Sequence, residues 1–322
     1  MSFLEKLSDL QVTVVGSYNT DLVIWCDAIP AKGQSLVGGE FDMYSGGRGA
    51  NCAVAAARAG CQVTFVGAHG RDIFGKMAVE RLTHERIDIQ HFIELPSSKT
   101  GVALMFQERG SGTHAALVAT SANNQFSADL VTKAEPDIRK SSLIFAQFEI
   151  GSSALSELFR LCERHRKRLV VHAAPVDRST HFPGGRYFLL IADDFDAQLL
   201  TRQGDIYAAI RELHRRGVQN VIIKHKDEAL IFSDGSGYHV QEIPSVRFMQ
   251  EAGVVECLTA WAGISLEITG DLACAAYVGA EAMAFSLSRY GAQDSLPYRS
   301  ELSVDWPKPS ARKHQTSTAK QE

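Results

Sequence analysis

Short apolar runs that alternate with helical patterns constrain the fold of this chain more than any other feature. Helical patterns at residues 50–59 and 206–216 are each followed by a glycine, which favours a helix end, and an alanine-rich helix is expected over about 272–289. Helices between strands favour a mostly parallel sheet with helices on both faces, so the sequence predicts an α/β, three-layer sandwich. The runs that read as buried strands are 11–16, 62–67, 143–147, 169–173, 187–192 and 220–225.

Two regions interrupt this rhythm, at residues 22–44 and 101–118. Alternating segments at 102–106 and 114–118 flank a glycine-containing turn at 108–112, a pattern typical of a β-hairpin. Strands inserted in this way predict a small second sheet beside the main one, which would serve as a β lid.

We expect one domain over residues 10–303, followed by a tail. The chain has 322 residues and 45% hydrophobic content, enough to bury a large core in one large domain or two smaller ones. Residues 304–322 are polar and lack periodicity, so we expect them to be disordered.

Charge and cysteine content argue against several classes of partner. The net charge is −4, and lysine and arginine are scattered, which argues against nucleic-acid binding. No run of about 18 or more apolar residues occurs, and the first residues lack the apolar core of a signal peptide, so we expect no membrane partner. Six dispersed cysteines without a Cys-x-x-Cys pair favour structural thiols in a reducing cytoplasm over a redox or metal role.

The first candidate site follows the strand at residues 11–16. Residues 16–21 read Gly-Ser-Tyr-Asn-Thr-Asp, which places Asn19 and Asp21 just beyond that strand. In an open α/β sheet, ligands bind at the carboxyl ends of the strands. A carboxylate accepts hydrogen bonds from two neighbouring hydroxyls, and an amide both donates and accepts, which suits a sugar diol. Turn formation is the alternative, because Asn and Asp also stabilise turns.

A glycine-containing turn opens the next helix. Residues 46–51 read Gly-Gly-Arg-Gly-Ala-Asn. Glycines allow the backbone to approach a ligand closely, and the free N–H groups of a helix start favour polar or anionic groups. Asn51 would lie just inside the helix and point back into the same crevice. A tight loop before a helix is the alternative.

The two motifs together, at this separation, resemble the ribokinase family of carbohydrate kinases, within the phosphofructokinase B superfamily. The resemblance spans residues 10–303 and is closest to the ribokinase branch. Further segments that carry it are 67–75 (Gly-Ala-His-Gly-Arg-Asp-Ile-Phe-Gly), 100–104 (Thr-Gly-Val-Ala-Leu), 122–124 (Ala-Asn-Asn), 147–149 (Gln-Phe-Glu) and 291–297 (Gly-Ala-Gln-Asp-Ser-Leu-Pro).

The resemblance implies a ribose-like sugar as the ligand. Asn19 and Asp21 would hold sugar hydroxyls, and Glu149 would contact the sugar from a neighbouring strand. Arg48 stands where the family usually has lysine, a change that keeps the charge but alters reach and hydrogen-bond geometry. The lid would close over the substrate, exclude water from the transfer step, and pair two subunits into a homodimer. The helix-start residues that would line the pocket are Gly46, Gly47, Arg48 and Asn51.

The C-terminal half departs from the family pattern. The family has a loop Asp-Thr-x-Gly-Ala-Gly-Asp, in which the turn and helix start form an anion hole and the last Asp is the catalytic base. Counting back from residues 291–293 places Glu256 at the base position, after Gln-Glu-Ala-Gly-Val-Val at 250–255. Gly253 is the loop residue that would still contact the nucleotide. A register error of one or two residues would put Cys257 or Leu258 at the base position instead.

Both changes in this loop are expected to weaken catalysis. Valine disfavours the positive φ angles that glycine allows, so Val254 and Val255 are expected to alter the shape of the anion hole. Glutamate adds a methylene to the base, and the resulting displacement of about 1 Å can cost about 10²-fold in rate.

The nucleotide side is altered as well. After the strand at 220–223 the family has a Thr-x-Gly-x-x-Gly turn, but residues 224–229 read Lys-His-Lys-Asp-Glu-Ala. Lys224 and Lys226 are candidates for phosphate contact, with solvated strand-end side chains as the alternative. Asp227 would add negative charge where the phosphates would lie.

A second nucleotide-side motif, Asn-x-x-Glu in the family, reads Asp193-Asp194-Phe195-Asp196 here. Asp193 would face ATP, and Asp196 would hold Mg²⁺ through water. A solvated loop and helix start is the alternative for both. His172, at the end of the strand at 169–173, faces the same crevice, either as a ligand contact or as a satisfied structural histidine.

Two functions remain open. In the first, the sugar pocket survives while ATP-dependent phosphotransfer is impaired or lost, which gives a sugar-binding pseudokinase. In the second, the chain is an active ATP- and Mg²⁺-dependent kinase that phosphorylates a primary hydroxyl of ribose, a related sugar or a nucleoside, with Glu256 as the base.

Overall fold

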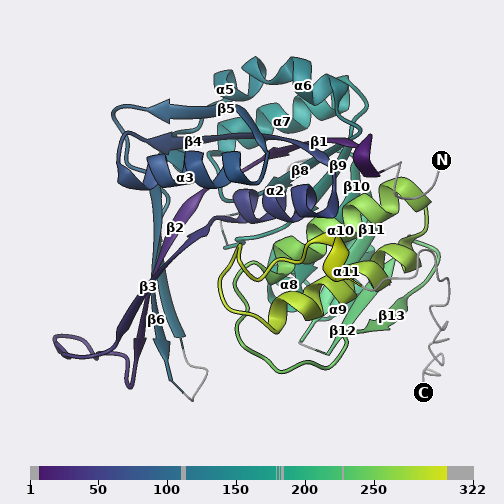
Figure 1. The fold of residues 1–322 in the computed structure, drawn as a ribbon. Helices are drawn as coiled ribbons and strands as arrows, with labels where there is room; N and C mark the ends of the chain where they lie inside the picture. The colour runs from purple at the N-terminus through teal and green to yellow at the C-terminus, as the bar shows by residue number, and fades with distance from the viewer. Residues whose placement is uncertain are drawn as a thin grey trace, which may run out of the picture.

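A computed structural model describes residues 7–109, 114–178, 180, 182, 185–226 and 228–302. Figure 1 shows a layered body from which a second, smaller sheet projects. The tail at 304–322, most of the hairpin turn at 108–112, and Asp227 lie outside the described residues.

The central sheet has nine strands in the order β13-β12-β11-β10-β9-β8-β1-β4-β5. The strands from β11 to β5 run parallel, and β12 and β13 pair antiparallel at one edge. All six predicted strands are present, which confirms the α/β class. The strands are β1 Gln11–Val15, β4 Gln62–Gly70, β5 Asp88–Leu95, β8 Leu143–Gln147, β9 Arg168–His172, β10 Tyr187–Asp193, β11 Val218–His225, β12 Ala229–Ser233 and β13 His239–Glu242.

Helices cover both faces of this sheet. Successive strand residues point to opposite sides, so apolar side chains on each face need a layer of helices to bury them. Val14 and Phe145 pack with α2, α3, α10 and α11 in one core, while Val15 and Ala146 pack with α5 to α9 in the other. The predicted three layers are therefore confirmed. The helices are α2 Arg48–Ala59, α3 Ile73–His84, α4 Ala122–Gln125, α5 Ala128–Lys133, α6 Glu135–Lys140, α7 Ser152–Arg164, α8 Asp194–Thr201, α9 Ile206–Arg215, α10 Val254–Thr269 and α11 Leu272–Leu287, with a 3₁₀ turn at Arg299–Glu301.

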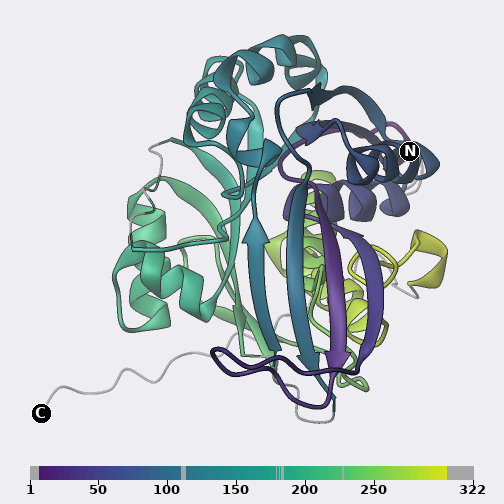
Figure 2. The same ribbon diagram turned by 90° about the vertical axis from the view of Figure 1, so that its left-hand side faces the viewer.

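The smaller sheet is the expected lid-like element, in the order β3-β2-β6-β7. Its strands are β2 Asn19–Cys26, β3 Glu40–Gly46, β6 Gly101–Glu108 and β7 His114–Ala119. Strands β2 and β6 run parallel and the outer pairs are antiparallel. The sheet is seen nearly edge-on in Figure 1, where it projects away from the helical layers, and face-on in Figure 2.

The base of the lid differs from expectation in one respect. The chain leaves the central sheet after Val15, and β2 already begins at Asn19. The two candidate sugar contacts, Asn19 and Asp21, are therefore lid-strand residues rather than the end of the first strand. Because β3 ends at Gly46, the glycine-containing turn also begins at the base of the lid.

None of the described helices is long and apolar enough to cross a membrane. The six cysteines all lie within the described residues as free thiols, and five of them are buried.

A buried ion pair anchors the helix that carries the glycine turn. Arg58, near the end of α2, donates to Glu85 through Nε (3.1 Å) and Nη2 (2.6 Å). Its Nη1 also donates to the carbonyls of Gln293 (2.8 Å) and Leu296 (2.7 Å), which ties the C-terminal segment to α2. Both charged side chains are about 95% buried, with 5% and 4% exposed.

We expect Glu85→Ala to lower the free energy of unfolding by about 3–5 kcal/mol, because it leaves the Arg58 guanidinium buried without its counter-charge. The measurement is urea unfolding followed by circular dichroism. Glu94→Ala is the matched control, since it removes an equally short pair with Arg71 that is exposed, and should cost about 1 kcal/mol or less. Equal losses in the two variants would contradict an anchoring role for the buried pair.

Candidate active site

A cavity of about 200 Å³ lies where the lid base meets the starts of α2 and α10. Each of these elements contributes polar groups, and two lid residues, Ala103 and Val118, add apolar wall. Eight of the predicted site residues line this one cavity: Asn19, Asp21, Gly47, Arg48, Asn51, Glu149, Gly253 and Glu256. The fold thus brings together residues more than 200 positions apart in the sequence. Four other predicted site residues do not line this cavity: Asp193, Asp196, Lys224 and Lys226.

The two N-terminal motifs touch through their backbones. Gly47 has φ of 90°, and a Cβ added there would lie 2.5 Å from the Asn19 nitrogen. A Cβ on Gly49 would lie 2.6 Å from the Gly16 Cα, and one on Gly46 would collide with the Asp21 carboxylate. These glycines are therefore required by close packing within the protein, which brings the start of α2 against the lid base.

Neighbouring residues orient the amide of Asn19. Asn123 donates from Nδ2 to the Asn19 Oδ1 (2.9 Å) and accepts at Oδ1 from the Tyr18 N–H (3.1 Å). The amide oxygen of Asn19 is thereby occupied, so its nitrogen is the group that it can offer to a ligand.

Two acceptors at the cavity have no donor within the described part of the chain. The Oδ1 of Asn51 is buried and has no hydrogen-bond partner. No hydrogen bond from a described residue reaches the Asp21 carboxylate. Since buried acceptors are normally paired, this pattern fits a ligand that brings hydroxyl donors.

Three carboxylates converge on this cavity. Burial, followed by the nearby charges of Glu149 and Glu256, raises the pKa of Asp21 to about 7. Glu149 itself accepts a short hydrogen bond from the Ser17 hydroxyl and a longer one from the Arg48 N–H (3.4 Å). Asp21 therefore changes charge near neutral pH.

Glu256 lies in the first turn of α10 and is held between two basic groups. The Arg48 Nη1 donates to its Oε1 at 3.1 Å, and the His172 Nδ1 lies 3.1 Å from the same oxygen. Burial would raise the pKa of Glu256, but His172 and Arg48 outweigh that effect and lower the pKa to about 2. The carboxylate is thus ionised and paired at neutral pH. Arg48, expected to line the sugar pocket, also neutralises the candidate base.

The turn before Glu256 is not distorted in the way the two valines led us to expect. Gly253 has φ of 81°, and α10 begins at Val254, so Val254 and Val255 are helical and need no positive φ. The expectation that valine strain reshapes the turn is therefore wrong. The one position that needs a positive φ still has glycine, and a Cβ there would lie 2.6 Å from the Ala292 carbonyl oxygen.

The turn after β11, where a phosphate-binding turn was sought, is occupied by an acidic side chain. Asp194 accepts from the Lys226 N–H (3.1 Å) and pairs with the His225 Nδ1 (2.9 Å). The Lys224 Nζ lies 3.7 Å from the Glu251 carboxylate. A polyphosphate would have to displace Asp194 from this turn.

The candidate metal position also serves another purpose. Asp193 caps α8 by accepting from the Asp196 N–H (2.7 Å). Burial, followed by the charge of Asp193, raises the pKa of Asp196 to about 6. The described residues contain no group of three or more side chains able to hold a metal ion. The donor-side carboxylates Asp193 and Asp194 already serve as hydrogen-bond acceptors for the protein's own backbone.

Sequence reasoning missed part of the lining. Ala103 and Val118 come from the paired strands β6 and β7 and follow from the alternating segments, once the lid register is known. Glu251, Ala252 and Val255 come from the segment before Glu256, which the sequence analysis considers only for phosphotransfer and not for sugar contact. The contact of His172 with Glu256 was not foreseen, although both were placed at the same crevice.

Comparisons with known proteins agree with this architecture. Residues 9–299 match the sequence profile described as pfkB family carbohydrate kinase. The chain is 26% identical over 295 residues to the ribokinase of Haemophilus influenzae, covering 90% of this chain and 96% of that protein. It is 25% identical over 295 residues to the deoxyribokinase of Salmonella typhi, covering 89% and 96%.

Solved structures show the same fold. The ribokinase of Giardia lamblia superposes with a TM-score of 0.81 at 20% identity, covering 91% of this chain and 98% of that one. The ribokinase of Arabidopsis thaliana, solved with ribose and ATP, gives 0.80 at 20% identity, covering 91% and 97%. The fold is therefore ribokinase-like. Since the family profile spans nearly all of the described residues, this chain belongs to the pfkB family of carbohydrate kinases.

Proposed function

We propose that this protein binds a ribose-like sugar and that its ATP-dependent phosphotransfer is impaired or lost. The observation that carries the proposal is the pairing of Glu256 with Arg48 and His172, each 3.1 Å from the same carboxylate oxygen. The sugar side of the cavity presents acceptors without protein partners, whereas the candidate base on the catalytic side is already paired with Arg48.

Sugar binding is supported by the kind of groups that line the cavity. Asp21 and Asn51 offer acceptors that no described residue uses, and Glu149 adds a third carboxylate beside them. Hydroxyl donors on neighbouring sugar carbons would satisfy these acceptors, since a carboxylate can accept from two donors at once. A volume of about 200 Å³ limits the ligand in this cavity to a small one.

Weak catalysis is supported by the charge state of Glu256. A general base works best with a pKa near the working pH, because it must be ionised yet still attract a proton. A pKa of about 2 leaves Glu256 ionised but weakly basic. To accept a proton from an alcohol, it would also have to give up part of a buried ion pair.

Weak nucleotide binding is supported by the turn after β11. The backbone N–H of Lys226 and the His225 ring, which could otherwise meet a phosphate, are engaged by Asp194. Binding of a polyphosphate would require an anion to replace this internal one.

The second candidate function, an active ATP- and Mg²⁺-dependent sugar kinase, is favoured by one observation. Gly253 keeps the left-handed conformation at the start of α10, and Glu256 opens onto the cavity that holds Asp21. In this case Glu256 is the base, Asp193, Lys224, Lys226 and Gly253 face ATP, and Asp196 faces Mg²⁺. The relatives named above support this candidate, since they are kinases by name.

The outer face of the lid supports a homodimer as the assembly. Residues paired across neighbouring strands point to the same face, and the pairings place Leu22, Ile24, Phe41, Met43, Leu104, Phe106 and Leu117 together on the side away from the cavities. Leu117 is 73% exposed and Phe41 62%. Such an apolar sheet face is typical of a protein interface.

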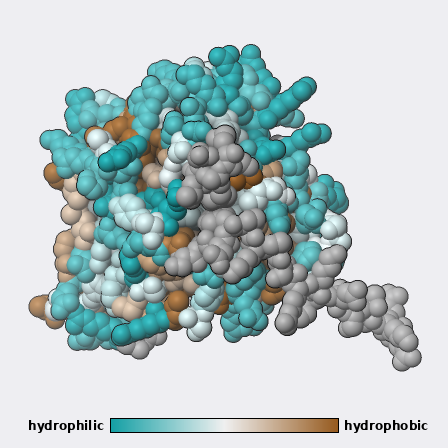
Figure 3. Space-filling model, turned by 45° about the vertical axis from the view of Figure 1, so that its right-hand side comes forward, coloured by the Kyte–Doolittle hydropathy of each residue, from teal (hydrophilic) through white to brown (hydrophobic). Residues whose placement is uncertain are grey.

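The face of the molecule seen in Figure 3 contrasts with the outer face of the lid. In the view of Figure 3, hydrophilic residues cover most of the molecule and brown residues occur in small separate groups. A second copy of the lid is the partner that we propose, with an outer face of the same character. We place the protein in the cytoplasm because its free thiols suit a reducing compartment.

Sugar affinity should rise with pH. Because the pKa of Asp21 is raised to about 7, the carboxyl is mostly protonated at pH 6 and mostly ionised at pH 8. Only the ionised form accepts from two hydroxyls, so ribose should bind about tenfold more tightly at pH 8 than at pH 6 in isothermal titration calorimetry. Asp21→Asn should bind weakly with no such pH dependence. A wild-type affinity that is flat across this range would contradict the role given to Asp21.

Sugar and nucleotide should act differently on thermal stability. Ribose at about 100 times its Kd should stabilise the protein by about 2.7 kcal/mol, whereas Mg²⁺-ATP should give no shift in Tm. In a coupled assay of ATP turnover, the wild type and Glu256→Gln should be indistinguishable. Turnover that depends on sugar and is lost in Glu256→Gln would instead establish the active kinase. Asp21→Asn is the control that assigns the ribose shift to this cavity.

Leu104→Glu should dissociate the dimer, because it places a charge at the centre of the apolar outer face of the lid. Light scattering after size-exclusion chromatography should give the mass of two chains for the wild type and of one chain, 35.2 kDa, for the variant. Ile73→Glu is the matched control, since Ile73 is 63% exposed but belongs to α3, outside the lid. A wild type that is monomeric at micromolar concentration would refute the lid interface.

A further inference from the structure

A cavity of about 530 Å³ lies at the amino-terminal edge of the central sheet, and we call it the basic cavity. Its lining comes from the first residues of β9, β10 and β11, from the end of α7 and from the residues that lead into β9 and β10. Arg168 opens β9 at this edge, whereas His172, which contacts Glu256, ends the same strand. The basic cavity is therefore separate from the sugar cavity, by about 13 Å along this strand.

Basic side chains dominate the charge of this cavity. Arg166, Lys167, Arg168 and Arg186 line it, and Glu163 is the one acidic side chain among its described lining residues. The chain as a whole has a net charge of −4, so this concentration of positive charge is local. Basic groups around a concave space raise the local concentration of anions. The cavity therefore favours an anionic ligand.

Two of the arginines are free to bind an anion. Arg166 and Arg186 are exposed and form no hydrogen bond or ion pair with any described residue. The other two basic groups are partly engaged, since Lys167 donates through Nζ to a backbone carbonyl (2.9 Å) and Arg168 donates through Nη1 to Glu267 (2.7 Å). Guanidinium groups form paired hydrogen bonds with phosphate oxygens, so two free ones at one cavity suit a phosphate group.

The remaining lining indicates what the phosphate is attached to. Phe159 is 8% exposed, and the guanidinium of Arg168 lies 4.9 Å from the centre of the Phe188 ring. Neither ring is exposed, so the described lining offers no open aromatic face on which a nucleobase could stack. The carboxylate of Glu163 and the carboxamide of Gln219 have no partner among the described residues. Both groups can pair with hydroxyls, which favours a polyol as the body of the ligand.

Glu163 also limits the number of anionic groups on the ligand. Its carboxylate would repel a second phosphate nearby, which disfavours a chain of phosphates such as that of ATP. A single phosphate ester already carries nearly two negative charges at neutral pH, enough to engage both free arginines. The cavity is also larger than the sugar cavity, so it has room for more than a phosphate ion.

We propose that the basic cavity is a second ligand site and that it binds a phosphorylated sugar. Arg166 and Arg186 hold the phosphate, with Lys167 beside them, and Glu163 and Gln219 accept and donate hydrogen bonds to the sugar hydroxyls. The proposal goes beyond the sugar cavity, and it holds for either of the two candidate functions.

The test measures the Kd values of ribose 5-phosphate, glucose 6-phosphate, inorganic phosphate and ribose by calorimetry on the wild-type chain. We expect at least one of the two sugar phosphates to bind about tenfold or more tightly than inorganic phosphate, because hydroxyl contacts add to those of the phosphate. Arg166→Asn combined with Arg186→Gln should weaken the binding of that sugar phosphate by about tenfold or more. Asparagine replaces Arg166 because it tolerates the left-handed conformation at this position, where φ is 50°.

Two further variants keep the test specific. Arg86→Asn is the matched control, since Arg86 is also exposed and left-handed, with φ of 58°, but does not line the basic cavity. It should leave the affinity for the sugar phosphate unchanged. Asp21→Asn should weaken the binding of ribose and not that of the sugar phosphate, because Asp21 belongs to the sugar cavity. The double variant should keep the wild-type affinity for ribose.

The outcomes separate this inference from the proposed function. If the double variant binds the sugar phosphates as tightly as the wild type does, or if Asp21→Asn abolishes their binding, the basic cavity does not hold them and the proposal fails. It fails equally if inorganic phosphate binds as tightly as both sugar phosphates, or if neither sugar phosphate binds. Ribose binding that depends on Asp21 would leave the proposed function standing in each of these cases.

Discussion

The site depends on one contact between two stretches of backbone. Residues 46–49 lie against residues 16–19 so closely that neither Gly47 nor Gly49 has room for a Cβ atom. The contact joins three elements at once: the end of β1, the start of α2, and the paired lid strands β2 and β3. Asn19, Asp21 and Asn51 converge because of it. A side chain at this contact would separate the lid from the helix, and the acceptors of the cavity would no longer face one ligand.

The two sides of the cavity hold carboxylates with different pKa values. On the lid side, Asp21 is only partly ionised near pH 7, because burial and nearby carboxylates raise its pKa to about 7. On the α10 side, Glu256 is fully ionised because Arg48 and His172 offset its burial. The single guanidinium of Arg48 is committed to the catalytic side. Acceptors without protein partners therefore gather where a sugar would lie, whereas the carboxylate at the base position already has Arg48 as its partner.

Much of the fold could be predicted from the sequence, because the interior strands are continuous apolar runs. The edge strands β5 and β13 do not follow from the sequence, because polar residues interrupt the apolar pattern at the sheet edges. The two glycine motifs identified the sugar side because their chemistry is local. The pairing of Arg48 with Glu256 joins residues 208 positions apart, and the capture of the β11 turn by Asp194 depends on how α8 packs. Neither interaction can be predicted from a local pattern in the sequence.

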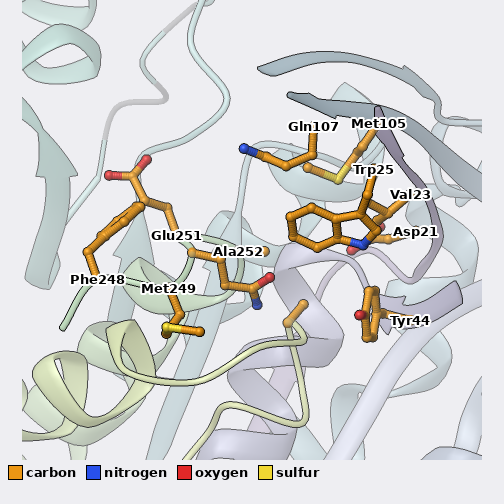
Figure 4. Close-up of a pocket in the computed structure, with 12 residues that line it drawn as sticks. Asp21, Val23, Trp25, Tyr44, Met105, Gln107, Phe248, Met249, Glu251 and Ala252 are labelled. Atoms are coloured by element: carbon orange, nitrogen blue, oxygen red, sulfur yellow. The ribbon is translucent and has the colours of Figure 1, made fainter. Parts of the chain in front are cut away.

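Strand β2 has consequences beyond its place in the lid. One face of β2 carries Asp21, in the sugar cavity, and Trp25, which lines the larger neighbouring cavity shown in Figure 4. The other face carries the apolar residues that we propose contact a second subunit. Because Asp21 is part of a lid strand, any rotation of the lid also moves Asp21. Ligand binding and the position of the lid are therefore coupled. In a dimer built on the outer faces, the lid of one subunit is the support for the other. Closure of one lid over a ligand would then also move the surface on which the lid of the other subunit rests.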